Sequence, residues 1–155
     1  MFQFKKFNVM VDYAHNPAGF QAIGKFLERV DAKPKIGIIA GVGDRRDEDI
    51  ILLGSLAAQM FDEIIIRQDR NLRGRSEQEI INLMLDGINS TNPKIPMKVI
   101  PSEKEAIDYA LNNAKKGSFI IICSDVVPDA LDQVMKYKEK EDEFEISHAD
   151  IPNMH

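Results

Sequence analysis

Short apolar runs alternate with amphipathic segments along the whole chain. Three of the runs, KIGIIA, EIIIR and SFIIIC, are almost continuously apolar, which is typical of strands covered by helices on both faces. Because strands of this kind belong to parallel sheets, the pattern predicts a mostly parallel sheet. The predicted strands are Phe7–Tyr13, Lys35–Ala40, Glu63–Arg67, Met97–Ile100 and Ser118–Ser124.

Between these runs, apolar residues recur three and four positions apart, which predicts four amphipathic helices. The four buried faces are Phe20, Ile23, Leu27 and Val30; Ile50, Leu53, Ala57 and Met60; Ile80, Met84 and Ile88; and Ile107, Ala110, Leu111 and Ala114. SEQE at Ser76 and SEKE at Ser102 match the capping box that starts a helix. A fifth helix is expected over Pro128–Glu139. The alternation predicts an α/β fold, a doubly wound, mostly parallel, Rossmann-like sheet with helices on both faces.

The length of 155 residues fits a single domain, which we place at residues 1–140. The remaining segment, residues 141–155, is acidic, lacks periodicity and contains Pro152. We therefore expect it to be a frayed helix end followed by a loosely ordered tail.

Composition narrows the classes of partner and the compartment. The net charge of −5 gives no overall basic surface, so we expect no nucleic-acid partner, and no apolar run is long enough to span a membrane. The lone Cys123 lies within an apolar run, where a buried and inert thiol is expected. The N-terminus lacks the pattern of a secretory signal, so we predict a cytoplasmic protein.

The stretch VDYAHNPAGF joins the first predicted strand to the first helix. Asn16 before Pro17 is a helix-start signal, because asparagine caps free backbone N–H groups and proline tolerates the first helical position. Asp12, Tyr13 and His15 then fall at the carboxyl edge of the sheet, beside a helix N-terminus that favours anions. Two interpretations stay open: these residues bind a phosphate or carboxylate, or Asp12 and His15 only bond to the backbone of the turn.

The second turn, GVGDRRDEDI, follows the strand KIGIIA. Its glycines permit tight turns, Asp44 or Asp47 could cap the next helix, and Arg45 and Arg46 could meet an anion. The turn lacks the third glycine of a dinucleotide-binding fingerprint. The chain also contains no G-x-x-x-x-G-K-[ST] loop, so we do not expect it to hold a triphosphate alone.

The third turn, RQDRNLRGR, carries four arginines in nine residues. Such a run is often only a solvated surface, but planar guanidinium groups at a sheet edge also bind carboxylates and phosphates in pairs. We expect the three turns to form one cleft. The later stretch SDVVPD is expected to cap the fifth helix through Asp125 or Asp129.

In this order and spacing, DYAHNPAG, GVGDRRDED and DRNLRGRSEQE resemble the C-terminal domain of the Mur ligase superfamily, closest to its cyanophycin synthetase branch. The likeness extends from Phe7 to about Lys138. The doubled arginine in GDRRDED and the LRGR loop favour the cyanophycin branch over the peptidoglycan branch, whose loop typically reads D-N-P-R. The resemblance matches Arg73 to the substrate-contacting arginine of D-N-P-R.

The resemblance implies an ATP-dependent amide ligase that works through an acyl phosphate. ATP and Mg²⁺ would be held mainly by a P-loop central domain, which would be a partner of this chain together with the amino acid and a peptide acceptor. In the cyanophycin branch, arginine is joined to polyaspartate. The resemblance implies nucleotide or phosphate contacts from Asp12, Tyr13, His15, Asn16, Asp44 and Arg45, substrate contacts from Arg70, Arg73 and Arg75, and no metal ligand.

The sequence also bears on two other classes of function. A free-standing module could bind a nucleotide or an acidic peptide at the same edge without catalysis. A self-sufficient hydrolase is disfavoured, because the chain has no G-x-S-x-G elbow or cysteine dyad and its histidines are scattered.

Overall fold

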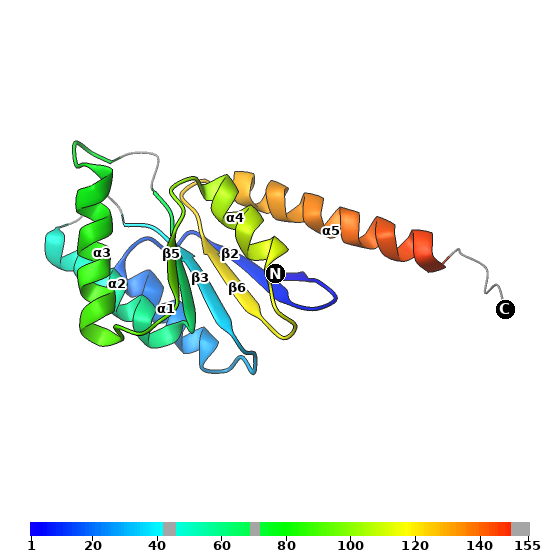
Figure 1. The fold of residues 1–155 in the computed structure, drawn as a ribbon, viewed down its shortest axis with the longest axis horizontal. Helices are drawn as coiled ribbons and strands as arrows, with labels where there is room; N and C mark the ends of the chain where they lie inside the picture. Colours follow the sequence, from blue (N-terminus) through cyan, green and yellow to red (C-terminus); the bar gives the residue numbers. More distant parts are fainter. Residues whose placement is uncertain (42–45, 69–71, 150–155) are drawn as a thin grey trace.

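The computed structural model describes residues 1–41, 46–68 and 72–149, with side chains up to residue 147. These residues form six strands and five helices that alternate along most of the chain (Figure 1). The strands are β1 (Phe2–Gln3), β2 (Asn8–Asp12), β3 (Lys35–Ile39), β4 (Glu63–Ile66), β5 (Met97–Val99) and β6 (Phe119–Cys123). The helices are α1 (Pro17–Leu27), α2 (Asp47–Met60), α3 (Glu77–Thr91), α4 (Glu103–Asn112) and α5 (Val127–Ala149).

The strands form one sheet in the order β1-β2-β6-β3-β4-β5. All neighbours are parallel except β1, which pairs antiparallel with β2 and was not predicted. Helices α1, α2 and α3 pack on one face of the sheet, and α4 and α5 on the other. The predicted doubly wound α/β fold is therefore confirmed.

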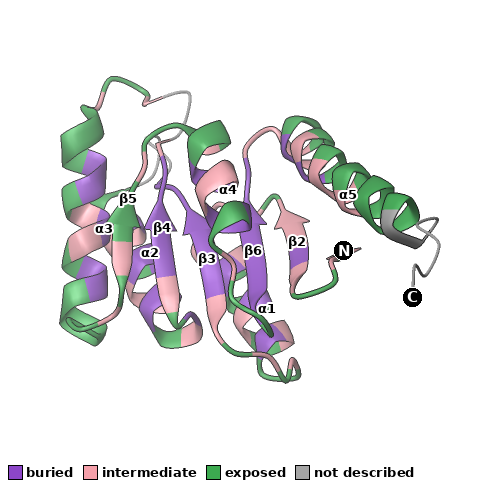
Figure 2. Cartoon of the chain, turned by 45° about the vertical axis from the view of Figure 1, so that its right-hand side comes forward, coloured by how far each residue is buried: buried purple, intermediate pink, exposed green. Residues whose placement is uncertain are grey.

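Two apolar layers hold this arrangement together, one on each face of the sheet. All five residues of β6 are buried, and β3 and β4 are buried except at their first residues (Figure 2). Such strands need apolar side chains on both faces, which explains their nearly continuous apolar sequences.

Three predicted helix starts are confirmed by side-chain caps. Asn16 Oδ1 accepts a hydrogen bond from Gly19 N at 2.8 Å, and the Ser76 and Ser102 hydroxyls accept from Glu79 N and Glu105 N. The expectation that Asp47 caps its helix is wrong: Arg46 occupies the N-cap position without a side-chain cap bond. Asp47 is instead the first residue of α2, and its alternative, Asp44, lies outside the described residues.

Helices α2 and α3 approach unusually closely because each presents a glycine to the other. A Cβ atom added at Gly87 would stand 1.9 Å from the Ile51 carbonyl oxygen, and one at Gly54 would stand 2.2 Å from that of Met84. The two backbones thus occupy the space that larger side chains would need.

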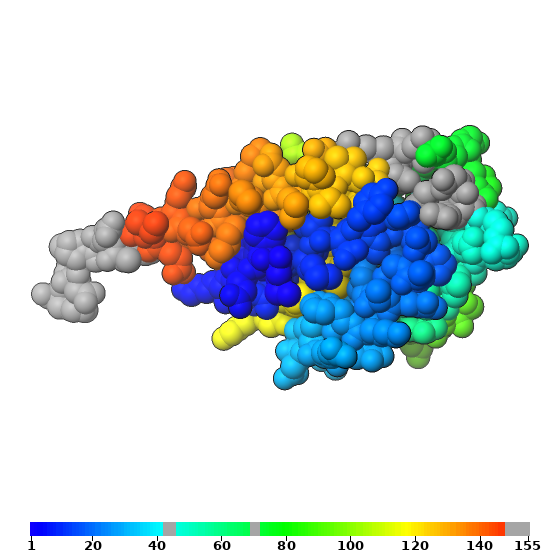
Figure 3. All heavy atoms as spheres, turned by 180° about the vertical axis from the view of Figure 1, so that it is seen from behind, coloured from blue at the N-terminus to red at the C-terminus, as the bar shows by residue number. Residues whose placement is uncertain are grey.

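Helix α5 continues ten residues beyond its predicted end at Glu139, so residues 141–149 are helical rather than a loose tail. Lys138 pairs with Glu141 and Asp142 at helical spacing, which supports the helix. Glu141 accepts a hydrogen bond from Lys5 N, and Glu145 lies 2.9 Å from Lys5 Nζ. The N-terminal residues accordingly lie against α5 (Figure 3).

Candidate functional site

The carboxyl ends of β2, β3, β4 and β6 meet along one edge of the sheet, as the parallel pairing requires. Backbone hydrogen bonds join the strand ends: Ser124 N donates to Asp12 O at 2.9 Å, and Arg67 N donates to Ile39 O at 2.8 Å. We call the described residues that follow these strands the polar edge. They are Asp12–Asn16, Gly41, Arg46–Asp47, Arg67–Gln68, Leu72–Ser76 and Ser124–Val126.

The first turn of the polar edge, Asp12–Asn16, is held by its own side chains. Asp12 Oδ1 accepts a hydrogen bond from Ala14 N at 2.8 Å, and His15 Nδ1 lies 2.9 Å from the Tyr13 carbonyl oxygen. A carbonyl oxygen can only accept, so His15 Nδ1 carries the proton of this bond and Nε2 is left for another partner. The backbone-bonding interpretation of Asp12 and His15 therefore holds for one atom of each, and a ligand role stays a prediction.

Two aromatic rings stand side by side at this turn. The ring centroids of Tyr13 and His15 are 4.6 Å apart, and the Tyr13 side chain is 56% exposed. The exposed ring of Tyr13 presents an apolar face and a polar hydroxyl at the polar edge.

The second turn is only partly described. Asp44 and Arg45, both predicted to meet the nucleotide, lie outside the described residues. Arg46 hydrogen-bonds Asp49 through Nε and Nη2, at 3.1 and 3.3 Å, and lies 3.4 Å from Glu48. Its charge is thus partly neutralised by the first turn of α2.

In the third turn, Arg70 lies outside the described residues, whereas Arg73 is exposed and has a left-handed backbone conformation with φ of 53°. Gly74 follows with φ of 83°. A non-glycine residue with positive φ is uncommon and costs on the order of 1 kcal/mol, and such residues cluster at functional sites. The substrate role of Arg73 stays a prediction.

Arg75 joins the third turn to the second. Its Nη1 lies 2.6 Å from Asp47 Oδ1 at the start of α2 and 2.9 Å from Glu79 Oε1 in α3. The hydrogen bond that Arg75 donates to the Asp47 carboxylate raises the pKa of Arg75 above its ordinary value. The two turns therefore lie together as predicted, but Arg75 is already engaged by two carboxylates. A shared cleft that includes the first turn remains a prediction.

The most deeply buried charge at the polar edge was not predicted. The Arg67 side chain is 4% exposed, and its Nε and Nη2 donate to the Cys123 carbonyl oxygen at 3.0 and 2.7 Å. Glu103 and Asp125 lie 3.5 and 3.4 Å from the same guanidinium group. The signal in the sequence was the position of Arg67 within EIIIR, a strand expected to be buried on both faces.

Cys123 is buried, as predicted. Burial, reinforced by the negative charge of Asp12 and opposed by Arg67, raises the pKa of the thiol to about 12. The thiol is therefore protonated at neutral pH and is a poor nucleophile.

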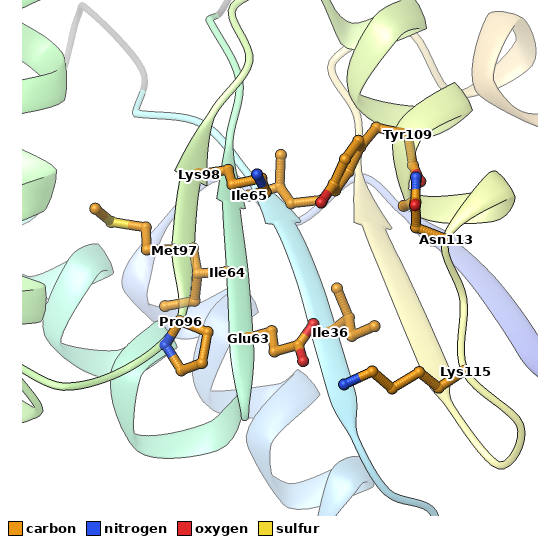
Figure 4. A pocket seen from close by; sticks show the side chains of 11 residues that line it. Ile36, Glu63, Ile64, Ile65, Pro96, Met97, Lys98, Tyr109, Asn113 and Lys115 are labelled. Carbon is orange, nitrogen blue, oxygen red and sulfur yellow. The ribbon is translucent and has the colours of Figure 1, made fainter.

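Four hollows of about 440 to 600 Å³ are lined by described residues, and none of the described predicted site residues lines any of them. One, of about 500 Å³, lies between β3, β4, β5 and α4 (Figure 4). Its lining includes Glu63 and Met97, the first residues of β4 and β5, so it lies at the amino ends of the strands, away from the polar edge.

Within the described part of the chain, no three or more His, Cys, Asp or Glu side chains lie together in a way suited to a metal ion. None of the helices described is long and apolar enough to cross a membrane.

Comparison with known proteins gives a consistent picture. Residues 2–126 match the family model described as Mur ligase, glutamate ligase domain. The cyanophycin synthetase of Crocosphaera subtropica is 42% identical over 131 residues, which make up 84% of this chain and 15% of that protein. The UDP-N-acetylmuramoyl-L-alanyl-D-glutamate--2,6-diaminopimelate ligase of Caldanaerobacter subterraneus is 38% identical over 118 residues, 76% of this chain and 24% of that protein.

Solved structures agree on the fold. A structure of a UDP-N-acetylmuramoyl-L-alanyl-D-glutamate--2,6-diaminopimelate ligase matches with a TM-score of 0.69 at 25% identity, over 78% of this chain and 24% of that one. FolC of E. coli, solved in complex with ADP, matches with a TM-score of 0.63 at 18% identity, over 85% of this chain and 29% of that one.

The chain thus spans about 15% of the cyanophycin synthetase and about a quarter of the Mur ligases that it matches. The family model covers well over half of the chain, and the polar edge follows the strands that this match includes. The chain belongs to the family of Mur ligase glutamate ligase domains, as the resemblance of its three turns predicted.

Proposed function

We propose that the chain is the C-terminal lobe of an ATP-dependent amide ligase of the cyanophycin synthetase type. In this role it closes over a P-loop domain, contacts the nucleotide and places the incoming amino acid for attack on an acyl phosphate. The observation that carries the proposal is the polar edge itself. There the ring pair of exposed Tyr13 and half-buried His15, and the left-handed Arg73, follow strands of the same sheet.

The described residues fit a contribution to a nucleotide site and do not fit a complete one. Phosphoryl transfer needs cations around the transferred phosphate. Arg46 and Arg75 already face carboxylates, and the sequence has no P-loop. The family resemblance implies that Mg²⁺ would be held by another domain. That domain would also supply the phosphate clamp when ATP is bound.

We assign the side chains of the polar edge the following contacts in the complete ligase. The Tyr13 and His15 rings would contact the nucleotide, and the free Nε2 of His15 could donate or accept a hydrogen bond there. Asn16 would keep α1 in place beneath them through its cap, and Asp44 and Arg45 would complete the nucleotide side. Arg73, with Arg70, would bind a carboxylate of the substrates, because guanidinium groups pair well with carboxylates.

For the substrates, we propose arginine as the incoming amino acid and polyaspartate as the acceptor. The support is that curated relatives between 37% and 42% identical to the chain are cyanophycin synthetases. The test is release of ADP by the complete gene product, with arginine, aspartate and glutamate compared against peptide acceptors. We expect ADP release to require both arginine and an aspartate-rich peptide. ADP release that depends on neither of them would refute this assignment.

Substitutions test the site within the same assay. We expect His15→Ala or Arg73→Ala to lower kcat/KM for ligation by about 10-fold to 100-fold, the usual cost of a lost charge-assisted contact. Both side chains lie at the protein surface rather than in the core, so the melting temperature should stay nearly unchanged.

Two controls accompany these variants. Arg29→Ala removes an exposed arginine at the far end of α1 and should change neither activity nor stability. Asn16→Ala removes a helix cap and should cost about 1 kcal/mol of unfolding free energy, which calibrates any effect of stability on the rate. If His15→Ala and Arg73→Ala melted early yet ligated normally, their roles would be structural and the proposed site would be wrong.

A further inference from the structure

We propose that Arg67 is a positioning residue for the polar edge. It fixes the end of β6, and through it the Asp12–Asn16 turn, in the place where the proposed ligase needs that turn. This inference rests on the proposed function for its purpose, but the positioning itself can be measured without any activity.

The guanidinium group of Arg67 holds the last residue of β6 with two hydrogen bonds. Nε and Nη2 both donate to the Cys123 carbonyl oxygen, and Nη1 donates to the Gln68 carbonyl oxygen at 3.3 Å. The Arg67 backbone N–H also donates to Ile39 O at the end of β3. One buried residue of β4's end thus touches the ends of both β3 and β6.

The next residue along carries this connection to the first turn. Ser124 N donates to Asp12 O, and the carboxylate of Asp12 then accepts from Ala14 N. The path from Arg67 to the turn that carries Tyr13 and His15 therefore runs through three consecutive hydrogen bonds. Each of these bonds has a backbone group on at least one side. A displacement of the Cys123 backbone is therefore expected to displace Asp12, where the Asp12–Asn16 turn begins.

Two carboxylates set the orientation of the guanidinium group. Glu103, the first residue of α4, lies 3.5 Å from Nε and accepts a hydrogen bond from the Ser124 hydroxyl at 2.7 Å. Asp125 lies 3.4 Å from Nη1. The side chains of Glu103 and Asp125 are 12% and 26% exposed, so this charged cluster is largely removed from water.

Stability alone does not account for such a cluster. Apolar residues of similar volume often stabilise a fold as well as a buried ion pair or better, because burying the charges costs as much as their attraction returns. The planar guanidinium group donates twice to one carbonyl oxygen and faces two carboxylates. These contacts allow only one arrangement of the ends of β3, β4 and β6, which apolar side chains would not impose.

The first test uses three variants of the chain. Arg67→Met leaves Glu103 and Asp125 without their cation and is expected to lower the melting temperature. The triple variant Arg67→Met, Glu103→Gln and Asp125→Asn removes all three charges and is expected to regain most of that loss. Arg67→Lys keeps the charge but cannot donate two bonds to Cys123 O while facing both carboxylates, and it serves if either methionine variant fails to fold.

Hydrogen exchange at single amides then separates positioning from folding. In the triple variant and in Arg67→Lys, exchange at Ala14 N should quicken at least tenfold, because its acceptor Asp12 is no longer held in place. Phe119 N, which donates to Pro34 O at the opposite edge, should be unchanged. Unchanged exchange at Ala14 in a variant of normal stability would overturn the proposal.

The second test places the same variants in the complete gene product. A misplaced turn should lower kcat for ADP release at least tenfold, with a smaller change in KM, because reaction requires closer alignment than binding. Recovery of kcat together with melting temperature in the triple variant would show that Arg67 only stabilises the fold. If the unaltered protein released no ADP, the proposed ligase function would fail, while the exchange experiment would still decide the role of Arg67.

Discussion

Cys123 is the last residue of β6, where the buried core of the sheet meets the polar edge. The pKa of its thiol indicates how completely this end of β6 is buried. Its pKa of about 12 arises chiefly from burial, since a thiolate loses its hydration inside the protein. The raised pKa means that the folded state favours the protonated thiol. The resulting contribution to stability is complete below the ordinary thiol pKa of 9.0 and is lost as the pH rises from there towards 12.

We therefore expect Cys123 to resist alkylation in the folded chain. At pH 8.5, labelling by iodoacetamide should be at least 100-fold slower than in urea, because only molecules that open expose the thiolate. The measurement is mass spectrometry over a time course with and without denaturant. Equal labelling rates in both conditions would show that the end of β6 is open in solution.

At the scale of single residues, prediction from sequence succeeded where a local rule was enough. The Asn16 cap depends only on residues three positions apart, and the burial of Cys123 follows from its apolar neighbours. The engagement of Arg75 with Asp47 spans 28 positions, and that of Arg67 with Cys123 spans 56. Partners that distant depend on the fold, so the same arginines looked equally available in the sequence.

At the scale of elements, the contact between α2 and α3 is the most constrained in the fold. Gly54 and Gly87 let the two backbones meet, so added volume at either position must push the helices apart. Because α2 starts at Asp47 and α3 follows Arg75, the Arg75–Asp47 ion pair depends on the same contact.

We expect Gly87→Ala to destabilise the chain by about 1–3 kcal/mol, the usual cost of overpacking, although alanine is the better helix former. Gly24→Ala in α1 is the matched control, since its Cβ would meet the Met60 sulfur at 3.5 Å, an ordinary contact. That variant should be neutral or up to about 1 kcal/mol more stable. Urea denaturation measures both, and equal effects at the two positions would contradict the close contact.

Most strands and helices were predicted to within a few residues, because the spacing of apolar residues within a segment indicates its secondary structure. Strand β1 and helix α5 are the exceptions. Strand β1 has two residues and no periodicity to detect, and it pairs only because the chain folds back on β2. Helix α5 continues beyond the residues that form its apolar face. Its later turns are stabilised by pairs of charged side chains and by Lys5, which is far away in the sequence.

At the scale of the whole molecule, four hollows of the described surface are lined by residues other than Arg73 and those of the Asp12–Asn16 turn. Ligand sites are usually concave and bury most of the ligand. Under the proposed function, the polar edge is one side of a site that another domain completes. The sequence predicted that the three turns follow strands of one mostly parallel sheet, and the parallel pairing of β2, β3, β4 and β6 confirms this. Their convergence on one cleft stays a prediction.

The affinity of the isolated chain for ATP tests this view. Isothermal titration should show weak binding or none at millimolar ATP, because the proposed phosphate clamp belongs to another domain. Adding Mg²⁺ should not change the result. A dissociation constant in the micromolar range would mean that the chain holds the nucleotide by itself, which favours a free-standing binding module.

The course of α5 has a practical consequence for all of these measurements. The helix starts beside the polar edge and runs outward for 23 residues, or about 34 Å, past β2 (Figure 1). A dye, a tether or a sensor surface attached after Ala149 would thus be far from Tyr13 and Arg73. Immobilising the protein by that end should leave the polar edge facing the solvent.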